Sequence, residues 1–177
     1  KRGHRTSFVA TRQTGIFIEG WGIAVDAVVA DFIAGAAEQI TIQGAKDHDI
    51  VLVEGQGSLL HPGYSGVTLG LLHGSCPDAL ILCHQVTRTH IGDYHGREPW
   101  VPIPPYTELI EIYEHAAEPV HPTQVIGICL NTYDMDEAAA REACERAAEE
   151  TGLPATDPVR FDSDALVDAI IGARATI

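Results

Sequence analysis

The chain has 177 residues, of which 45% are hydrophobic and 20% are charged. This length and composition are typical of one compact domain and exclude a disordered or fibrous protein. The 25 acidic residues outnumber the 11 lysines and arginines and give a formal net charge of -14, which disfavours nucleic acid and anionic membranes as partners. Since no apolar run is long enough to span a bilayer, we expect a cytoplasmic protein.

Short apolar runs bounded by turn residues predict β-strands. Their apolar residues are successive rather than alternating, which is typical of parallel strands that are covered on both faces. The runs are residues 6–10, 50–53, 79–83 and 125–130. Helical patterns lie between and after them, at residues 24–40, 106–117, 136–151 and 164–173.

The alternation of strands and helices predicts an α/β fold, with a mainly parallel sheet between two layers of helices. We expect residues 1–177 to form a single domain. In such sheets, ligands bind where loops leave the carboxyl ends of the strands. The loops that we expect at that edge are residues 11–22, 54–65, 84–100 and 131–134.

The clearest chemical signal is Glu54, which ends an apolar run and is followed by two glycines within three residues. A strand that ends in an acid delivers its carboxylate to the sheet edge, and the glycines let backbone amides approach an anion. We predict that Glu54 binds magnesium or water; the alternative is a carboxylate that only caps the following turn. The predicted phosphate or oxyanion binders are Gly55, Gln56, Gly57 and Ser58.

His61 lies in the same loop, where an imidazole with a pKa near neutrality is a candidate acid or base. Because it precedes a proline, the alternative is a histidine that packs at a turn. The other strand-to-loop junction, residues 8–15, offers uncharged hydrogen-bonding groups and the planar guanidinium of an arginine. We predict a substrate pocket there; a hydrogen-bonded turn with a surface arginine is the alternative. The predicted pocket residues are Thr11, Arg12, Gln13, Thr14 and Gly15.

The four cysteines form no CxxC pair, and three of them lie in or beside apolar or alanine-rich segments, which predicts reduced, buried thiols. The nine histidines match no standard zinc spacing, so we expect no structural zinc. The printed sequence contains no GxSxG, GxGxxG or GxxxxGK[ST] motif.

Residues 8–15, 22–38 and 53–62 together resemble one bacterial and archaeal family. Its members include D-glutamate N-acetyltransferases, and its C-terminal domain is similar to the P-loop fold of dethiobiotin synthetase. The turn Glu54-Gly55-Gln56-Gly57 resembles the EGxGG turn of that synthetase, in which the glutamate helps to hold magnesium. The resemblance therefore implies a P-loop NTPase-like fold.

Members of this family carry an N-terminal domain, a first strand and a phosphate loop before the segment that residues 11–15 resemble. The resemblance implies that this chain is the C-terminal domain without that strand and loop. The sheet edge beside residues 6–10 would then be open, so we expect a homo-oligomer or a partner segment that covers it. Arg12 stands where the resemblance leads us to expect a small residue.

The resemblance implies acetyl transfer from acetyl-CoA to the amino group of an acidic amino acid such as D-glutamate. Glu54 or His61 would be the base, amides of residues 55–58 would stabilise the oxyanion, and Arg12 or Arg88 would hold the substrate carboxylate. Two alternatives remain open. One is ligation or phosphorylation that depends on ATP and Mg²⁺, and the other is an inactive fragment that serves as a subunit or interaction module.

Overall fold

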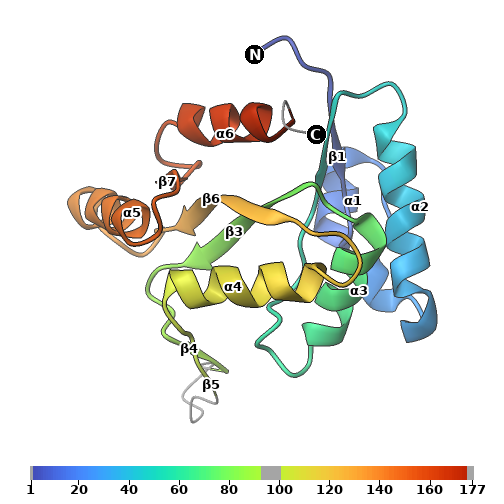
Figure 1. Ribbon diagram of the computed structural model, residues 1–177, viewed down its shortest axis with the longest axis horizontal. Coiled ribbons are helices and arrows are strands. Elements are labelled where there is room, and N and C mark those ends of the chain that lie inside the picture. Colours follow the sequence, from blue (N-terminus) through green and yellow to red (C-terminus); the bar gives the residue numbers. More distant parts are fainter. Residues whose placement is uncertain (1, 93–100, 175–177) are drawn as a thin grey trace. The chain divides into compact units, whose positions relative to one another are not determined.

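The computed structural model describes residues 2–92 and 101–174 (Figure 1). Its contacts divide the chain into two compact units, Lys1–Cys76 and Pro77–Ile177. The expectation of a single domain stays a prediction. Part of the predicted loop at residues 84–100, namely 93–100, lies outside the described residues.

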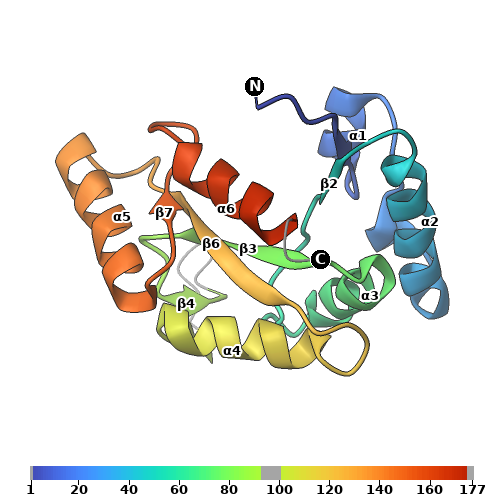
Figure 2. The same cartoon turned by 45° about the horizontal axis from the view of Figure 1, so that its top comes forward.

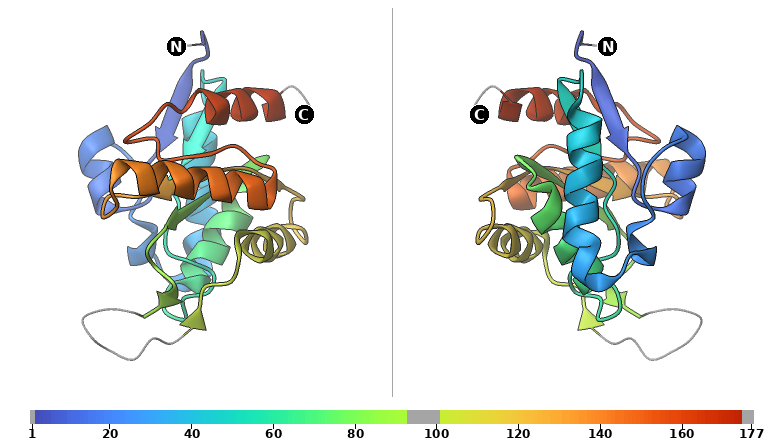
Figure 3. Two further views of the ribbon diagram at one scale, coloured as in Figure 1. Left: turned by 90° about the vertical axis from the view of Figure 1, so that its left-hand side faces the viewer. Right: turned by 90° about the vertical axis from the view of Figure 1, so that its right-hand side faces the viewer.

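The first unit combines a two-stranded parallel sheet with helices. Its strands β1 (Thr6–Val9) and β2 (Ile50–Val53) pair with Thr6 opposite Ile50. Its other elements are α1 (Gln13–Glu19), the 3-10 turns η1 (Val25–Ala27) and η2 (Ala30–Phe32), α2 (Ile33–Ala45) and α3 (Ser65–Ser75). Helix α2 runs alongside β1 (Figure 3). The core of the unit consists of Val9, Val25, Ala37, Ile40 and Leu71.

The prediction of one helix over residues 24–40 is wrong in its first half. Ile23 and Val25 donate backbone hydrogen bonds to the carbonyls of Ala10 and Thr11, at 3.1 and 3.0 Å, which ties this segment to the end of β1. Val25 is fully buried there. Tertiary burial therefore replaces the first helical turns with two 3-10 turns, and the regular helix starts only at Ile33.

The prediction of a loop over residues 11–22 is also wrong, because α1 occupies seven of its residues. This helix carries Phe17 and Ile18 with 90% and 76% of their surface exposed. Its apolar side chains are thus not confined to a buried face, so the usual amphipathic signal of a helix is missing.

Helix α3 packs closely on α2 through glycines spaced four residues apart. A Cβ atom built on Gly74 would lie 2.1 Å from the carbonyl oxygen of Ala34, and one on Gly70 would lie 2.7 Å from a methyl carbon of Ile33. Because the backbones approach this closely, larger residues at either position would push the two helices apart.

The second unit has a three-stranded parallel sheet in the order β3-β6-β7. Helices α4 and α6 lie on opposite sides of β3 and β6 (Figure 2). This arrangement confirms the expected α/β fold with mainly parallel sheet. The elements are β3 (Ala79–Gln85), β4 (His90–Ile91), β5 (Val101–Pro102), α4 (Tyr106–Ala117), β6 (Gln124–Asn131), α5 (Glu137–Thr151), β7 (Ala155–Thr156) and α6 (Asp164–Arg174).

The predicted helices of the second unit are confirmed to within one residue. Helix α5 starts after Asp136, whose Oδ1 accepts the Ala139 amide at 2.8 Å, and ends at Gly152 in the left-handed conformation with φ of 72°. None of the described helices is both long and apolar enough to cross a bilayer.

All four cysteines are free thiols, but the prediction that they are buried is wrong for two of them. Cys144 is buried and Cys129 is half-buried, whereas Cys76 and Cys83 are exposed. Cys76 caps α3, at the end of the helix. Leu166 of α6 covers the sheet at Gly127, beside Ile81, which is two residues before Cys83 on β3.

Candidate functional site

The carboxyl ends of β1 and β2 lie side by side because the two strands are parallel and in register, with Val9 opposite Val53. Glu54 follows β2 directly and continues the ladder, since its amide donates to the Val9 carbonyl at 2.9 Å. Thr11 lies two residues beyond β1 and is fully buried. The two junctions singled out in the sequence are thus brought together at one sheet edge.

The Glu54 carboxylate binds the backbone at the start of α1. Its Oε2 accepts the amides of Thr11 at 2.8 Å and Arg12 at 3.1 Å. Arg12 is the N-cap residue of α1 but supplies no side-chain cap of its own. Glu54 therefore supplies from β2 an acceptor for amides that would otherwise be unsatisfied.

Thr11 and Gln56 complete a small network around this carboxylate. The Thr11 hydroxyl donates to the Glu54 carbonyl at 2.9 Å. Gln56 Nε2 donates to the Thr11 carbonyl at 2.9 Å and to the Thr11 hydroxyl at 2.7 Å. Because each group has a defined donor or acceptor, the loops after β1 and β2 hold one another in a single arrangement.

Gly15 is the residue of α1 that faces the carboxylate. A Cβ atom built there would lie 2.5 Å from Glu54 Oε2 and 3.1 Å from the Ala10 Cβ atom. Glycine is therefore required at this position by the close approach of the Glu54 side chain.

The two oxygens of the Glu54 carboxylate differ in their hydrogen bonds. Within residues 2–92 and 101–174, Oε2 accepts the amides of Thr11 and Arg12, and no protein donor reaches Oε1. The side chain is half-buried, so it is fixed in place while still reachable. A held carboxylate with one open oxygen can accept a proton from an amine or bind a metal-coordinated water.

The rest of the predicted loop at residues 54–65 is folded onto α3. His61 Nδ1 accepts the Gly63 amide at 3.0 Å, and its ring lies 4.4 Å from that of Tyr64. A neutral His61 thus carries its proton on Nε2. The Ser58 hydroxyl accepts the Leu60 amide at 3.1 Å. These bonds give His61 and Ser58 a role in the turn, alongside any role with substrate.

The remaining predicted residues differ in their surroundings. Arg12, Gln13 and Thr14 are exposed at the start of α1. A Cβ atom on Gly55 would meet no atom within 4 Å, so its backbone faces open space, whereas Gly57 packs against Tyr64. Arg88 belongs to the second unit, whereas Glu54 belongs to the first.

A second carboxylate network, in the second unit, was not predicted from the sequence. Asp157 follows β7 and is 3% exposed. Its Oδ2 accepts the Thr132 amide at 3.0 Å and the Thr132 hydroxyl at 2.6 Å, while Oδ1 accepts the Val159 amide at 3.0 Å. Burial alone would raise the pKa of Asp157, but hydrogen bonds from Thr132, Val159 and Arg160 outweigh it and hold the pKa below its usual range.

Arg160 closes this network from the other side. Its Nη1 donates to the carbonyls of Thr132 at 2.7 Å and Met135 at 2.9 Å. The guanidinium thereby satisfies backbone acceptors in the loop after β6. The sequence signal for Thr132 is its position just after the apolar run of β6, whereas the two-residue strand before Asp157 gives no such signal.

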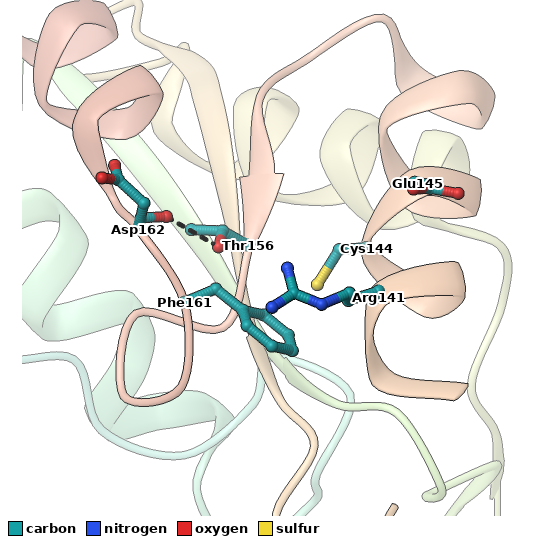
Figure 4. A pocket seen from close by; sticks show the side chains of 6 residues that line it. All are labelled: Arg141, Cys144, Glu145, Thr156, Phe161 and Asp162. Carbon is teal, nitrogen blue, oxygen red and sulfur yellow. Dashed lines mark hydrogen bonds between the residues drawn. The ribbon is translucent and has the colours of Figure 1, made fainter. Parts of the chain in front are cut away.

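A hollow of about 260 Å³ lies between α5 and the segment after β7 (Figure 4). The Arg141 guanidinium stacks at 4.3 Å on the Phe161 ring, and the Thr156 hydroxyl donates to the Asp162 carbonyl at 3.0 Å. The hollow contains none of the residues predicted as a site. Its lining residues are Arg141, Cys144, Glu145, Thr156, Phe161 and Asp162.

The family model described as "Domain of unknown function (DUF1611_C) P-loop domain" matches residues 1–167. The chain belongs to the DUF1611 family. The crystal structure of a DUF1611 family protein from Anabaena variabilis has a TM-score of 0.89 and 49% identity, covering 97% of this chain and 49% of that one. The resemblance found in the sequence and the P-loop fold class are thereby confirmed.

Two curated relatives of this DUF1611 chain are named D-glutamate N-acetyltransferase. The protein from a Pseudoalteromonas species is 45% identical over 163 residues, which are 90% of this chain and 47% of the relative. The protein from Tritonibacter scottomollicae is 44% identical over 170 residues, which are 96% of this chain and 50% of the relative. The chain spans about half the length of the curated relatives it matches.

Proposed function

We propose that this chain is part of an N-acetyltransferase that moves an acetyl group from acetyl-CoA to the amino group of an acidic amino acid such as D-glutamate. Support comes from the 44–45% identity to two proteins of that name. The structural observation that carries the proposal is the Glu54 carboxylate, which the amides of Thr11 and Arg12 hold through one oxygen while the other stays open.

The chemistry needs a base because the amine must lose a proton as it attacks. The nitrogen bonds to the thioester carbonyl carbon, the carbon–sulfur bond breaks, and the CoA thiolate takes up a proton. In the proposed mechanism Glu54 Oε1 accepts the amine proton. Backbone amides of residues 55–58 stabilise the developing oxyanion, and the open space beside Gly55 supports this role. His61, the other base expected from the sequence, is better suited to donate a proton than to accept one, because its Nδ1 already accepts the Gly63 amide.

An acidic acceptor fits the groups around this carboxylate. Arg12 is exposed at the N-cap of α1 and offers a planar pair of donors to a substrate carboxylate. Gln13 and Thr14 add neutral donors in the first turn of the helix, and Arg88 is a further candidate for the second carboxylate. In this proposal Arg12 replaces a small residue in order to bind substrate.

A second candidate function is ATP-dependent ligation or phosphorylation of the dethiobiotin synthetase type. The description of the family as a P-loop domain favours it. Glu54 Oε1 would then bind a water of a hydrated Mg²⁺, which commonly keeps several waters and takes one or two protein carboxylates. The third candidate, a subunit or interaction module without catalysis, would leave both chemistries absent.

The test is direct product analysis of the purified protein. Incubation with acetyl-CoA and D-glutamate, without ATP, is expected to yield N-acetyl-D-glutamate detected by mass spectrometry. L-Glutamate and D-alanine, run in parallel, test the need for the D configuration and for the side-chain carboxylate. ADP formed only in the presence of ATP and Mg²⁺ would favour the second candidate. If neither N-acetyl-D-glutamate nor ADP forms, the result would favour the third candidate, a subunit or interaction module.

Two further proposals about the whole protein rest on the sequence. We propose a cytoplasmic location, in keeping with an acetyl-CoA-dependent reaction on a free amino acid. We also propose that β1, which pairs with β2 alone among the described strands, gains a neighbour from a second copy or a partner segment. Sedimentation at micromolar concentration tests the second, because a stable monomer would contradict self-association.

A further inference from the structure

Two cysteines lie side by side on neighbouring strands of the sheet in the second unit. Cys83 of β3 lies opposite Cys129 of β6 in a parallel register. Residues opposite each other on neighbouring strands point to the same face of a sheet, and the strands lie about 4.8 Å apart. Disulfides form between residues whose Cα atoms are about 4.4–6.8 Å apart. The register therefore brings two thiols, 46 positions apart in the chain, within bonding reach.

The two thiols are chemically unequal. A hydrogen bond from Cys129 lowers the pKa of Cys83 to about 7, even though burial opposes the shift. The same hydrogen bond raises the pKa of Cys129, and burial, the Cys83 sulfur and the Asp157 carboxylate raise it further. Of the two thiols, Cys83 is therefore the one that loses its proton more readily.

The two cysteines also differ in their exposure to solvent. Cys83 is exposed and Cys129 is half-buried beside it. A soluble reagent therefore meets the better nucleophile first, with a second thiol held directly next to it. The other two cysteines lack this pairing, since Cys76 caps α3 and Cys144 lies in α5, outside the strand register that pairs Cys83 with Cys129.

We propose that Cys83 and Cys129 form a thiol–disulfide exchange site for low-molecular-mass disulfides. The Cys83 thiolate attacks one sulfur of the disulfide, forms a mixed disulfide and releases the first thiolate, which takes a proton from water. Cys129 then gives up its proton and attacks Cys83 Sγ, which breaks the mixed disulfide and releases the second thiol. The two protein thiols are oxidised, and the reagent is reduced to two thiols.

The spacing of the strands makes this protein disulfide reversible. The Cβ atoms of a disulfide are typically about 3.8 Å apart, which is less than the strand spacing of about 4.8 Å. The strands must approach locally for the bond to form, and such strain makes a disulfide easier to reduce. The site would therefore respond to the balance of oxidised and reduced thiols.

The test uses glutathione disulfide as the probe and peptide mapping by mass spectrometry as the readout. The unaltered protein is expected to lose two hydrogens and to carry a Cys83–Cys129 link without retained glutathione. Cys129→Ser is expected to stop at a glutathione adduct on Cys83, and Cys129→Ala checks this result without a hydroxyl. Cys83→Ser is expected to react at Cys129 at least about tenfold more slowly.

Cys76→Ser is the matched control, because it removes the other exposed thiol and is expected to react like the unaltered protein. Circular dichroism of each variant checks that the fold is kept. The proposal is overturned by reaction mainly at Cys76, by a glutathione adduct on Cys83 that persists in the unaltered protein, or by Cys129→Ser and Cys129→Ala variants that fold but form no adduct on Cys83.

Discussion

The turn around Glu54 and the turn around Asp157 have the same hydrogen-bonding pattern. Each carboxylate directly follows a strand, β2 or β7, and each accepts the amide of a threonine just beyond the neighbouring parallel strand. Thr11 and Thr132 are both fully buried. Both carboxylates thus tie two loops together at the carboxyl edge of their sheet.

The two turns differ in what remains of each carboxylate. Both oxygens of Asp157 accept hydrogen bonds, and the group is 3% exposed. Glu54 uses one oxygen for two amides and is half-buried. The comparison teaches that position at the sheet edge does not by itself indicate function. Asp157 has no oxygen without a hydrogen bond, whereas Glu54 has one oxygen that no donor in the described residues reaches.

The largest expected effect is on stability at Asp157. Replacing Asp157→Ala leaves the Thr132 amide and hydroxyl and the Val159 amide without an acceptor in a buried site, which we expect to cost about 3 kcal/mol of unfolding free energy. Chemical denaturation followed by circular dichroism measures it. Glu149→Ala, on the exposed side of α5, is the control and should change stability by less than about 0.5 kcal/mol. Equal effects of the two variants would refute the scaffold assignment.

The next effect comes from crowding the Glu54 turn. In Gly15→Ala, the added methyl would lie 2.5 Å from Glu54 Oε2, so the carboxylate must leave the Thr11 and Arg12 amides. We expect a loss of about 2 kcal/mol. Hydrogen exchange should show faster exchange of those two amides. The control Gly35→Ala lies in open space on α2 and should instead gain roughly 0.5–1 kcal/mol. Unchanged amide protection in Gly15→Ala would contradict the contact.

A smaller effect is the acid sensitivity that Asp157 confers. The pKa of Asp157 is lower in the folded than in the unfolded protein, where it is about 3.9. The stability that the ionised Asp157 contributes is therefore complete at pH values above this unfolded-state pKa, and it is lost as the pH falls through the folded-state pKa. Unfolding free energies measured from pH 7 down to pH 3 should therefore fall more steeply in the unaltered protein than in Asp157→Asn. Parallel curves for the two proteins would count against the hydrogen-bonded carboxylate.

Local sequence signals predicted the fold where they agreed with tertiary structure. The bounds of β2 and α4 match residues 50–53 and 106–117, since each has an apolar pattern with clear breakers beside it. Helices α1 and α3 were missed for different reasons. The exposed Phe17 and Ile18 hide the amphipathic pattern of α1, whereas α3 packs through Gly70 and Gly74, which carry no hydrophobic signal.

The candidate site was predictable to the extent that it is local. An apolar run that breaks into Glu54 and Gly55 marks a sheet edge, and the contact with Thr11 follows from two parallel strands in register. The Asp157 network was not predictable in this way. Strand β7 has only two residues and owes its conformation to pairing with β6. Arg160 binds backbone carbonyls, which every residue type has, so the sequence does not show which ones it will bind.

The central claim is that Glu54 serves chemistry while Asp157 serves structure, and paired kinetics and denaturation of Glu54→Gln and Asp157→Asn test it most directly. An amide oxygen at position 54 can still accept the Thr11 and Arg12 amides, so we predict unfolding free energy within about 1 kcal/mol of the unaltered protein, with kcat for D-glutamate acetylation at least about 100-fold lower. Asp157→Asn should lose stability but keep kcat within about threefold at temperatures where it is folded. Full acetyl-transfer activity in a folded Glu54→Gln variant would contradict the account.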